Sequence, residues 1–414
     1  MMESDLATVL ARFSGAARQV GETAAASEDY AFEVSVVMPC LNEADTVGSC
    51  VAKARQALES HGLAGEVIVA DNGSSDDSRG IAERAGARVV PVAGRGYGSA
   101  LMGGISAARG RYVIMGDADD SYDFGQVPRF VERLREGYDL VQGCRLPSGG
   151  GQVLPGAMPL LHRIWGNPMF SLMARRWFRA PIHDVHCGMR GFTAGFYRRM
   201  DLRCTGMEFA SEMIIKATLQ GARIGEVPIT LHPDGRTSHS PHLRTFRDGW
   251  RHLRFYLVYS PRWLFLHPGI ALILLGLLCY AIAMPRLTIG HVTFDVHTLL
   301  FGSLFVICGY QSILFAVFAK VFAITERLLP EDPRMTRLFR IVTLEKGLIA
   351  GGLAIAAGAL CLAVAVGQWW AAGFGPLDYD RTMRWVIPGV TFTALGFQTL
   401  LSSFFLSVLG LRRQ

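Results

Sequence analysis

The chain changes character near residue 262, where a mixed polar and apolar sequence gives way to long apolar runs. Before that point, short β-rich runs alternate with stretches of helical spacing. The runs that predict strands are 34–38, 66–70, 88–92, 111–115 and 139–142, and those that predict helices are 44–60, 76–85, 99–109 and 126–136. Strands separated by helices of this length predict an α/β domain with a mostly parallel sheet covered on both faces.

Four later runs are long enough to cross a membrane as helices. They cover 263–284, 298–319, 347–370 and 385–411, and none contains Asp, Glu, Lys or Arg. A bilayer core of about 30 Å needs about 20 apolar residues in a helix, so each run is sufficient. Buried core helices are the alternative, but helices that are apolar all round over this length are uncommon in soluble proteins. We therefore predict four transmembrane helices.

The basic residues between these runs predict the orientation. Six lie between the second and third runs and two near the C-terminus, whereas the other two connections hold three together. Because basic connections stay in the cytoplasm, we predict that both ends and the large N-terminal domain are cytoplasmic, in an inner or plasma membrane. Residues 1–30 hold acidic residues and no apolar core, so we expect a mobile lead-in and no signal peptide.

The segment 242–262 predicts an amphipathic helix directly before the first apolar run. Phe246, Trp250, Leu253 and Leu257 share one face, and Arg244, Arg247, Arg251 and Arg254 form a neighbouring stripe. Aromatic residues at the headgroup level and arginines on anionic lipid are typical of an interfacial helix. A soluble amphipathic helix is the alternative, but the adjoining apolar run favours the membrane surface.

Composition limits the compartment and the classes of partner that fit this chain. The eight cysteines show no CxxC spacing, which favours a reduced compartment without a disulfide framework or a zinc site. The formal net charge of +6 suits a membrane with anionic lipid, although solvated surface charge explains it equally well. We expect a membrane and small molecules as partners, and no nucleic acid.

Polar motifs follow four successive predicted strands. They read PCLNEAD, DNGSSDDS, GRGYGS and GDADDSYD in chain order. In open α/β sheets, ligands bind at the carboxyl ends of the strands. Each motif alone has a plain alternative, because Asn, Gly, Ser and Asp form turns and cap helices, and GRGYGS departs from both the P-loop and GxGxxG. Delivered in order to one rim, the four motifs predict a ligand site.

The fourth motif brings carboxylates together, and these would repel one another without a cation. Asp117 and Asp119 flank one small residue at a strand end, so their side chains point the same way if strand geometry continues. Such oxygen ligands suit Mg²⁺ or Mn²⁺, with a diphosphate as the cation's other ligand. Asp120 and Asp123 either support these ligands or begin the following helix.

The ordered motifs resemble family-2 glycosyltransferases, which have a Rossmann-like nucleotide-sugar binding (GT-A) fold. The similarity runs over about 34–240 and takes in DLVQGCR, DVHCGMRGF, GMEFASEMIIKA and PDGRTSHS. These later motifs are similar to the branch that includes dolichyl-phosphate mannose and glucose synthases and bacterial polyprenyl-phosphate sugar transferases. The predicted organisation is a lead-in (1–30), a GT-A domain (31–241), an interfacial helix (242–262) and a transmembrane domain (263–414).

The resemblance implies roles for individual residues. The nucleoside pocket would comprise Pro39, Leu41, Asn42, Glu43 and Asp71, with Leu41 at a position where relatives often have an aromatic residue. Asp117 and Asp119 would bind Mg²⁺ or Mn²⁺ and the diphosphate. Arg145 and Arg190 would face the acceptor phosphate, and Arg236 would close over the donor diphosphate. Ser121 stands where some relatives use Gln on the metal, so water or Asp120 would complete the shell.

The implied reaction moves a hexose from a UDP- or GDP-sugar to a polyprenyl or dolichyl phosphate. A phosphate monoester is already anionic and needs no general base, and attack from the side opposite the leaving group predicts inversion. Glu208 and Glu212 share a face of the predicted helix 207–219. We assign both to the donor sugar. Two alternatives stay open: one of the two is a structural acid, or one is the general base of a transferase that acts on hydroxyls. His183, Asp184 and His186 favour loop ordering over a metal site.

Two other functions fit parts of the sequence. A processive polysaccharide synthase shares the donor fold, and RTMRW at 381–385 matches the Q/R-x-x-R-W signature of such enzymes, but on the predicted outer face. A membrane scaffold that binds nucleotide without turnover is the second. Four spans are more than a tether needs. Two further roles stay open for them, homo-oligomerisation and access of the lipid.

Overall fold

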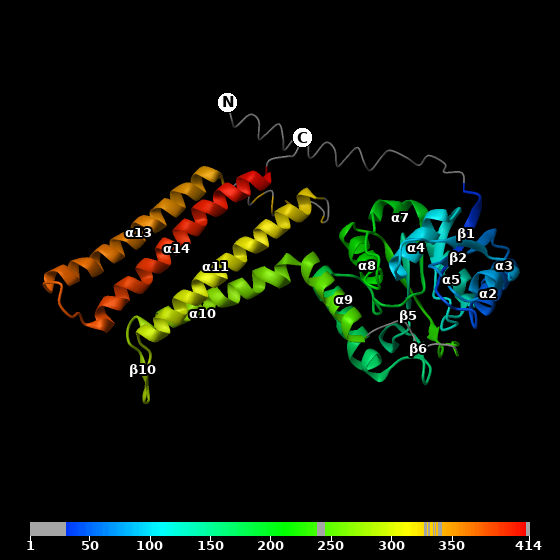
Figure 1. The fold of residues 1–414 in the computed structure, drawn as a ribbon, viewed down its shortest axis with the longest axis horizontal. Coiled ribbons are helices and arrows are strands. Elements are labelled where there is room, and N and C mark those ends of the chain that lie inside the picture. The colour runs from blue at the N-terminus through cyan, green and yellow to red at the C-terminus, as the bar shows by residue number, and fades with distance from the viewer. Residues whose placement is uncertain are drawn as a thin grey trace, which may run out of the picture. The chain divides into compact units, whose positions relative to one another are not determined.

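The computed structural model describes residues 30–237, 245–326 and 342–410, with isolated positions between 327 and 341. Residues 1–29 of the predicted lead-in therefore lie outside the described residues. The chain forms two compact units, and Figure 1 shows the elements of each. The second unit takes in Leu172–Ala180, Ile214–Gly221 and the described chain from residue 245 onward, and the first takes in the rest.

The first unit is built on a seven-stranded sheet of order β3-β2-β1-β4-β7-β5-β8. The strands are β1 (Phe32–Cys40), β2 (Gly65–Asp71), β3 (Arg88–Pro91), β4 (Gly110–Met115), β5 (Leu140–Cys144), β7 (Arg190–Thr193) and β8 (Ile224–Pro228). All pairs are parallel except those of β7, which runs antiparallel between β4 and β5. The five predicted strands and the mostly parallel α/β sheet are confirmed, and β7 and β8 were not predicted.

Helices pack on both faces of this sheet because the internal strand β1 is apolar on both sides. Val36 and Met38 of β1 are buried with Cys50 of α2 (Val47–Ser60) and Phe130 of α5 (Val127–Arg135). Val37 points to the opposite face, where α4 (Tyr97–Ala107) approaches through Gly104, and a Cβ there would lie 2.7 Å from Val37. The remaining helices are α3 (Ser78–Arg84), α7 (Ala194–Met200) and α8 (Phe209–Leu219).

A helix that was not predicted runs from Leu160 to Phe178. It consists of α6 (Asn167–Met173) between two π-helical segments, His162–Gly166 and Ala174–Phe178. Small strands β6 (Gln152–Val153) and β9 (Thr230–Leu231) pair beside the main sheet. The chain that follows β9 then runs back toward the acidic loop after β4.

The second unit contains α9 (Thr245–Tyr259) and four long apolar helices. These are α10 (His267–Ala283), α11 (Val296–Thr325), α13 (Leu344–Ala371) and α14 (Tyr379–Gly410), with the hairpin of β10 (Thr288–Ile289) and β11 (Val292–Thr293) after α10. The stretches long and apolar enough to span are Arg262–Ala283, Val296–Thr325, Leu344–Ala371 and Tyr379–Leu409. Only 11% to 22% of their most apolar windows is buried within the protein. Such exposed apolar surface suits lipid and disfavours a soluble helical core, so the four predicted helices are confirmed.

Glycines form the seams of two helical hairpins. Gly269 and Gly276 of α10 face Gly309 and Gly302 of α11, and a Cβ on Gly276 would lie 2.7 Å from the Gly302 carbonyl oxygen. Gly351 and Gly358 of α13 face Gly396 and Gly389 of α14 in the same way. Small residues let transmembrane backbones approach closely, which is how helices pack without a hydrophobic driving force.

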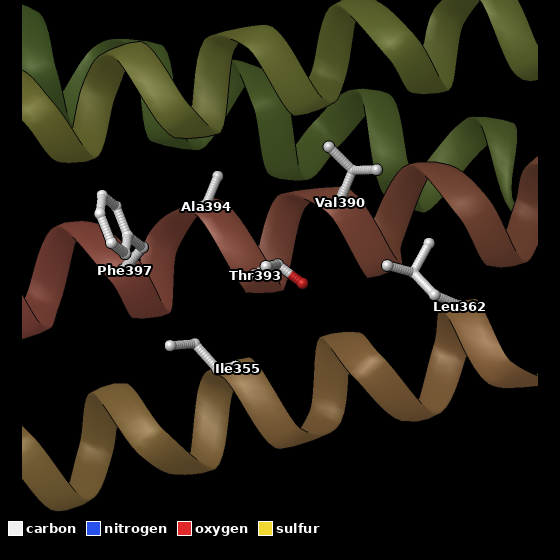
Figure 2. Close-up of a pocket in the computed structure, with 6 residues that line it drawn as sticks. All are labelled: Ile355, Leu362, Val390, Thr393, Ala394 and Phe397. Atoms are coloured by element: carbon white, nitrogen blue, oxygen red, sulfur yellow. The ribbon is translucent and has the colours of Figure 1, made fainter.

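The two hairpins meet through α11 and α14, and an apolar groove lies on the second hairpin. Tyr310 of α11 and Thr399 of α14 share a hydrogen bond of 2.7 Å. Figure 2 shows the groove between α13 and α14, a cavity of about 510 Å³. It is lined by Ile355, Leu362, Val390, Thr393, Ala394 and Phe397. The Thr393 hydroxyl donates to the Gly389 carbonyl within its own helix, so the lining is almost wholly apolar.

Candidate active site

Two loops that follow β1 and β2 form one side of the rim. Asn42, at φ 59°, accepts hydrogen bonds on Oδ1 from the Ser75 amide (2.8 Å) and hydroxyl (3.1 Å). The Glu43 amide donates to the Ser78 hydroxyl at 2.8 Å. The motifs PCLNEAD and DNGSSDDS are therefore bonded to each other, and the predicted nucleoside residues Pro39, Leu41, Asn42, Glu43 and Asp71 come from these two neighbouring strand ends.

Asp71 ends β2 as a buried carboxylate. It accepts hydrogen bonds from the Gly73 amide (3.1 Å), the Ser74 amide (3.2 Å) and Arg79 Nε (2.7 Å). Burial opposes ionisation of Asp71, but these hydrogen bonds outweigh it and hold the pKa of the carboxyl below its ordinary value. Asp71 thus carries a fixed negative charge at the rim and shapes the turn that follows.

Asp117 lies half-buried just beyond β4. Its Oδ1 accepts a hydrogen bond of 2.8 Å from the Tyr97 hydroxyl, and a Cβ on Gly188 would lie 2.5 Å from its Oδ2. Burial, and then the nearby charge of Asp119, raise the pKa of Asp117 to about 6. The charge of Asp119 is therefore close enough to oppose ionisation of Asp117, as expected where two carboxylates share a cation.

Asp119 is held from both sides. Its Oδ1 accepts from the Ser121 amide (3.1 Å) and hydroxyl (2.6 Å), and its Oδ2 accepts from Arg236 Nη2 at 2.6 Å. Arg236 Nε also lies 3.2 Å from Glu43 Oε2 and 3.1 Å from Asp234 Oδ1. The segment before Arg236 runs along the acidic loop, because the Gly235 amide donates to the Asp119 carbonyl at 2.9 Å.

The other two aspartates of the motif turn away from this pair. Asp120 pairs with Lys53 of α2 at 2.7 Å. Asp123 caps the short helical turn Phe124–Gln126, where its side chain accepts from the Gly125 amide at 2.9 Å. The motif is thus divided between a carboxylate pair at the rim and two structural acids.

A divalent cation fits Asp117 and Asp119. Both offer carboxylate oxygens, the donors that Mg²⁺ and Mn²⁺ prefer, and Asp119 already attracts a guanidinium in this structure. Among the described residues, no group of three His, Cys, Asp or Glu side chains could hold a metal ion. Two protein carboxylates with phosphate oxygens and water in the remaining positions is a common arrangement for Mg²⁺.

Arg145 lies at the end of β5 in a buried ion pair. Its Nε and Nη2 bond Asp184 Oδ2 and Oδ1 at 2.7 and 2.9 Å, and its Nη1 lies 3.3 Å from the Tyr122 hydroxyl. The Tyr122 hydroxyl also accepts from the Gly188 amide at 2.8 Å. Arg145 is thus fixed beside the loop that contacts Asp117, with its charge balanced by Asp184.

Arg190, the second residue predicted to face the acceptor phosphate, is fully buried. Its Nε, Nη1 and Nη2 donate to the carbonyls of Cys187 (2.9 Å), Ala210 (2.6 Å) and Val185 (2.9 Å). All three nitrogens are engaged with backbone, so this geometry favours support of the loop before β7 over contact with a ligand. The predicted loop ordering by His183, Asp184 and His186 agrees with their contacts, since His183 Nδ1 lies 2.6 Å from Glu226 Oε2.

Glu208 and Glu212 do not share one environment. Glu212 is fully buried and accepts from the amides of Arg203 (3.0 Å) and Cys204 (2.8 Å), which makes it a structural acid. Glu208 is half-buried, and its Oε2 has no hydrogen-bond partner among the described residues. Of the two acids assigned to the donor sugar, only Glu208 therefore keeps an oxygen for a ligand.

The glycines of GRGYGS serve a close backbone approach. A side chain on Gly96 or Gly98 would collide with the carbonyl oxygens of Thr205 and Cys204. The Ser99 amide donates to the Thr205 carbonyl at 3.2 Å, so the two loops are joined. The sequence did not predict this contact, because the loop of Cys204 and Thr205 lies more than 100 residues further along the chain. Glu212 holds that loop in place.

The helix Leu160–Phe178 is the largest feature of the site that sequence reasoning missed. Its inner side contacts the loop before β7, where Ser171 Oγ accepts from the Val185 amide at 3.1 Å and Phe170 packs on His186. Its outer side is apolar but exposed, with Ile164 at 60% and Trp165 at 67%. Leu160, Leu161 and Met169 extend this exposed surface. A contiguous exposed apolar surface marks an interaction site.

The fold, the acidic pair at the rim and the four apolar helices together define a membrane-anchored GT-A glycosyltransferase. Residues 35–200 match the glycosyl transferase family 2 model, and residues 317–410 match the glycosyltransferase family 2 C-terminal transmembrane region. The chain belongs to glycosyltransferase family 2 and is an integral membrane protein.

Individual relatives extend over different shares of the chain. It is 37% identical to the low-salt glycan biosynthesis hexosyltransferase Agl6 of Haloferax volcanii, over 93% of this chain and 91% of that protein. It is 32% identical to a dolichyl-phosphate hexose transferase of the same organism, over 49% of this chain and 84% of that protein. The crystal structure of Mycobacterium tuberculosis glucosyl-3-phosphoglycerate synthase with UDP and Mn²⁺ gives 22% identity and a TM-score of 0.41, over 55% of this chain and 79% of that one.

Proposed function

We propose that this enzyme transfers one hexose from a UDP- or GDP-linked sugar to a polyprenyl or dolichyl phosphate at the cytoplasmic membrane surface. The observation that carries the proposal is the pair Asp117 and Asp119 at the rim of a domain that also exposes apolar helical surface. A dolichyl-phosphate hexose transferase among the relatives supports a lipid phosphate as acceptor.

The donor site comprises the first two strand ends and the acidic pair. Asn42, Glu43 and Asp71 line the nucleoside pocket, and Asp117 and Asp119 hold Mg²⁺ or Mn²⁺ with the diphosphate. The cation, when bound, neutralises charge that develops on the departing nucleoside diphosphate. Glu208 offers to a sugar hydroxyl its Oε2, which has no hydrogen-bond partner in the described parts of the chain. Arg236 leaves Asp119 for the diphosphate, which gives its guanidinium a stronger anionic partner.

Arg145 guides the acceptor phosphate, and Arg190 contributes indirectly by supporting the loop before β7. Asp184 orients the Arg145 guanidinium through two hydrogen bonds, so an incoming phosphate meets a preorganised fork. Arg190 keeps the loop of Val185 and Cys187 in place. The acceptor oxygen then attacks the anomeric carbon from the side opposite the diphosphate, and the configuration inverts.

The lipid acceptor is presented by the membrane. Trp263, at the start of the first span, stacks on Trp177 with ring centroids 5.2 Å apart. Tryptophan is enriched at the headgroup level, so we propose that both rings lie there. Phe246 and Trp250 of α9 are 86% and 60% exposed, as the interfacial interpretation requires. The predicted orientation, with both ends cytoplasmic, completes this proposal.

The signature-like RTMRW has a structural role instead of a catalytic one. Arg384 bonds Asp295 and the Ala283 carbonyl, and Arg286 bonds Asp380, so these residues tie the end of α10 to the start of α14. We therefore do not favour a processive synthase. A panel of UDP- and GDP-sugars with a short polyprenyl phosphate and Mn²⁺ tests the function by extractable radiolabelled lipid. Polymer formed without lipid phosphate, or full transfer in excess chelator, contradicts it.

A further inference from the structure

Tyr97 is the only residue of the Gly-rich motif whose side chain reaches the acidic pair among the described contacts. It begins α4, and its hydroxyl donates to Asp117 Oδ1 at 2.8 Å. On the other side of the same carboxylate, Gly188 has no side chain, and a Cβ there would lie 2.5 Å from Oδ2. One oxygen of Asp117 is thus anchored, and the space beside the other is kept open by glycine.

The backbone that carries Tyr97 is itself tied down at two points. Asn72 accepts from the Gly96 amide at 2.8 Å and donates to the Gly94 carbonyl at 2.6 Å, which connects the motif to the loop of Asp71. On the opposite side, the Thr205 carbonyl accepts from the Ser99 amide. A side chain on a backbone that is fixed at two points has less freedom to lose when it forms a hydrogen bond. The Tyr97 hydroxyl is therefore preorganised.

We propose that Tyr97 is a positioning residue, which fixes the Asp117 carboxylate in the orientation that receives the divalent cation of the nucleoside diphosphate. The proposal rests on the proposed function, because it takes Asp117 as a ligand of that cation. It assigns to the Gly-rich motif a role other than direct phosphate binding. Tyr97 links the nucleoside loop, through Asn72, to the metal-binding carboxylate.

The test compares nucleotide binding with and without metal in the purified full-length protein. We expect Tyr97→Phe to weaken Mn²⁺-dependent binding of UDP, or of GDP if the wild type prefers it, by about tenfold, as for loss of a hydrogen bond to a charged group. Binding without metal should be unchanged, because the nucleoside loops are untouched. Tyr112→Phe is the matched control, a buried tyrosine near the start of β4, away from Asp117.

A double-mutant cycle separates positioning from general structural support. In an Asp117→Asn background, Tyr97→Phe should have no additional effect on Mn²⁺-dependent binding. Equal loss of binding with and without metal, or wild-type affinity in Tyr97→Phe, overturns the inference. If the wild type itself shows no Mn²⁺-dependent nucleotide binding, the assignment of Asp117 fails first and the proposed function fails with it.

Discussion

Arg236 Nη2 lies 2.6 Å from Asp119 Oδ2, so a cation from the C-terminal part of the GT-A domain already occupies one carboxylate of the acidic pair. Burial opposes the charge of Arg236, but Asp119, Glu43 and Asp234 outweigh it and raise the pKa of the guanidinium further. The same carboxylate cannot serve a divalent cation fully while this ion pair persists. We therefore expect metal binding at Asp119 to be coupled to movement of Arg236.

Arg236→Gln should strengthen Mn²⁺ binding in the absence of nucleotide, because the competing guanidinium is removed. The same substitution should slow sugar transfer at least tenfold, because the diphosphate loses its cationic partner. Mn²⁺ titration monitored by electron paramagnetic resonance measures the first effect, and labelled lipid measures the second. Arg133→Gln, which removes an exposed ion pair with Glu136, should change neither. Weaker Mn²⁺ binding in Arg236→Gln would contradict the competition.

Asp119→Asn should abolish nearly all transfer, by at least about 100-fold, because the developing charge on the diphosphate is no longer neutralised through the cation. Metal-dependent donor binding should fall with it. Asp123→Asn is the matched control within the same motif, since Asp123 caps a helical turn. It should leave metal-dependent binding unchanged. Full transfer by Asp119→Asn would remove the acidic pair from the mechanism.

Arg145→Lys should raise the KM for lipid phosphate more than that for nucleotide sugar, because lysine cannot reproduce the fork that Asp184 orients. Arg190→Met should instead lower the melting temperature, because three buried carbonyls lose their donor at a cost of about 1–3 kcal/mol each. Steady-state kinetics and thermal unfolding separate the two outcomes. A larger effect of Arg145→Lys on the donor KM would move Arg145 to the donor site.

Trp165→Glu should reduce transfer to lipid phosphate embedded in vesicles while leaving nucleotide binding intact, because a charge on the exposed apolar helix opposes insertion into the bilayer surface. Ala52→Glu places the same charge on the exposed side of α2 and should have little effect. The comparison uses one preparation of anionic vesicles for both variants. Equal activity of Trp165→Glu and wild type would argue that this surface meets another partner.

Gly276→Leu should disrupt the α10–α11 hairpin, because even a Cβ at this position would lie 2.7 Å from the Gly302 carbonyl oxygen. A Cβ on Gly352 of α13 would meet nothing within 4 Å, so Gly352→Leu should be tolerated. Thermal unfolding in detergent distinguishes the two variants. Similar stability in both would show that the glycine seam is not tightly packed.

The sequence predicted the elements whose side-chain pattern repeats, and it missed those fixed by single contacts. Five strands and four spans follow from apolar runs, and the acidic pair follows from its place after β4. Strand β7 has the sequence RGFT, which does not by itself predict a strand. It forms because it pairs with its neighbours β4 and β5. The apolar solvent side of the helix around Trp165 also hides its boundaries, since helix prediction assumes a polar outer face.

The roles of the arginines could not be predicted from residue type. Arg145 and Arg190 end similar motifs, yet one bonds a carboxylate and the other three backbone carbonyls. Arg236 contacts Asp119 across 117 positions of sequence. Such contacts depend on how distant loops meet, and a single sequence contains no periodic signal for them.

The glycine seams give the two helical hairpins one shared packing pattern, as a tandem repeat of a helix-pair module would. Glycines seven positions apart recur on all four helices, and each pair meets its partner in the same antiparallel register. Because α11 contacts α14, a pseudo-twofold axis between these two helices would exchange one hairpin for the other. Two modules that each return the chain to its starting side place this axis along the bilayer normal, the arrangement of parallel repeats.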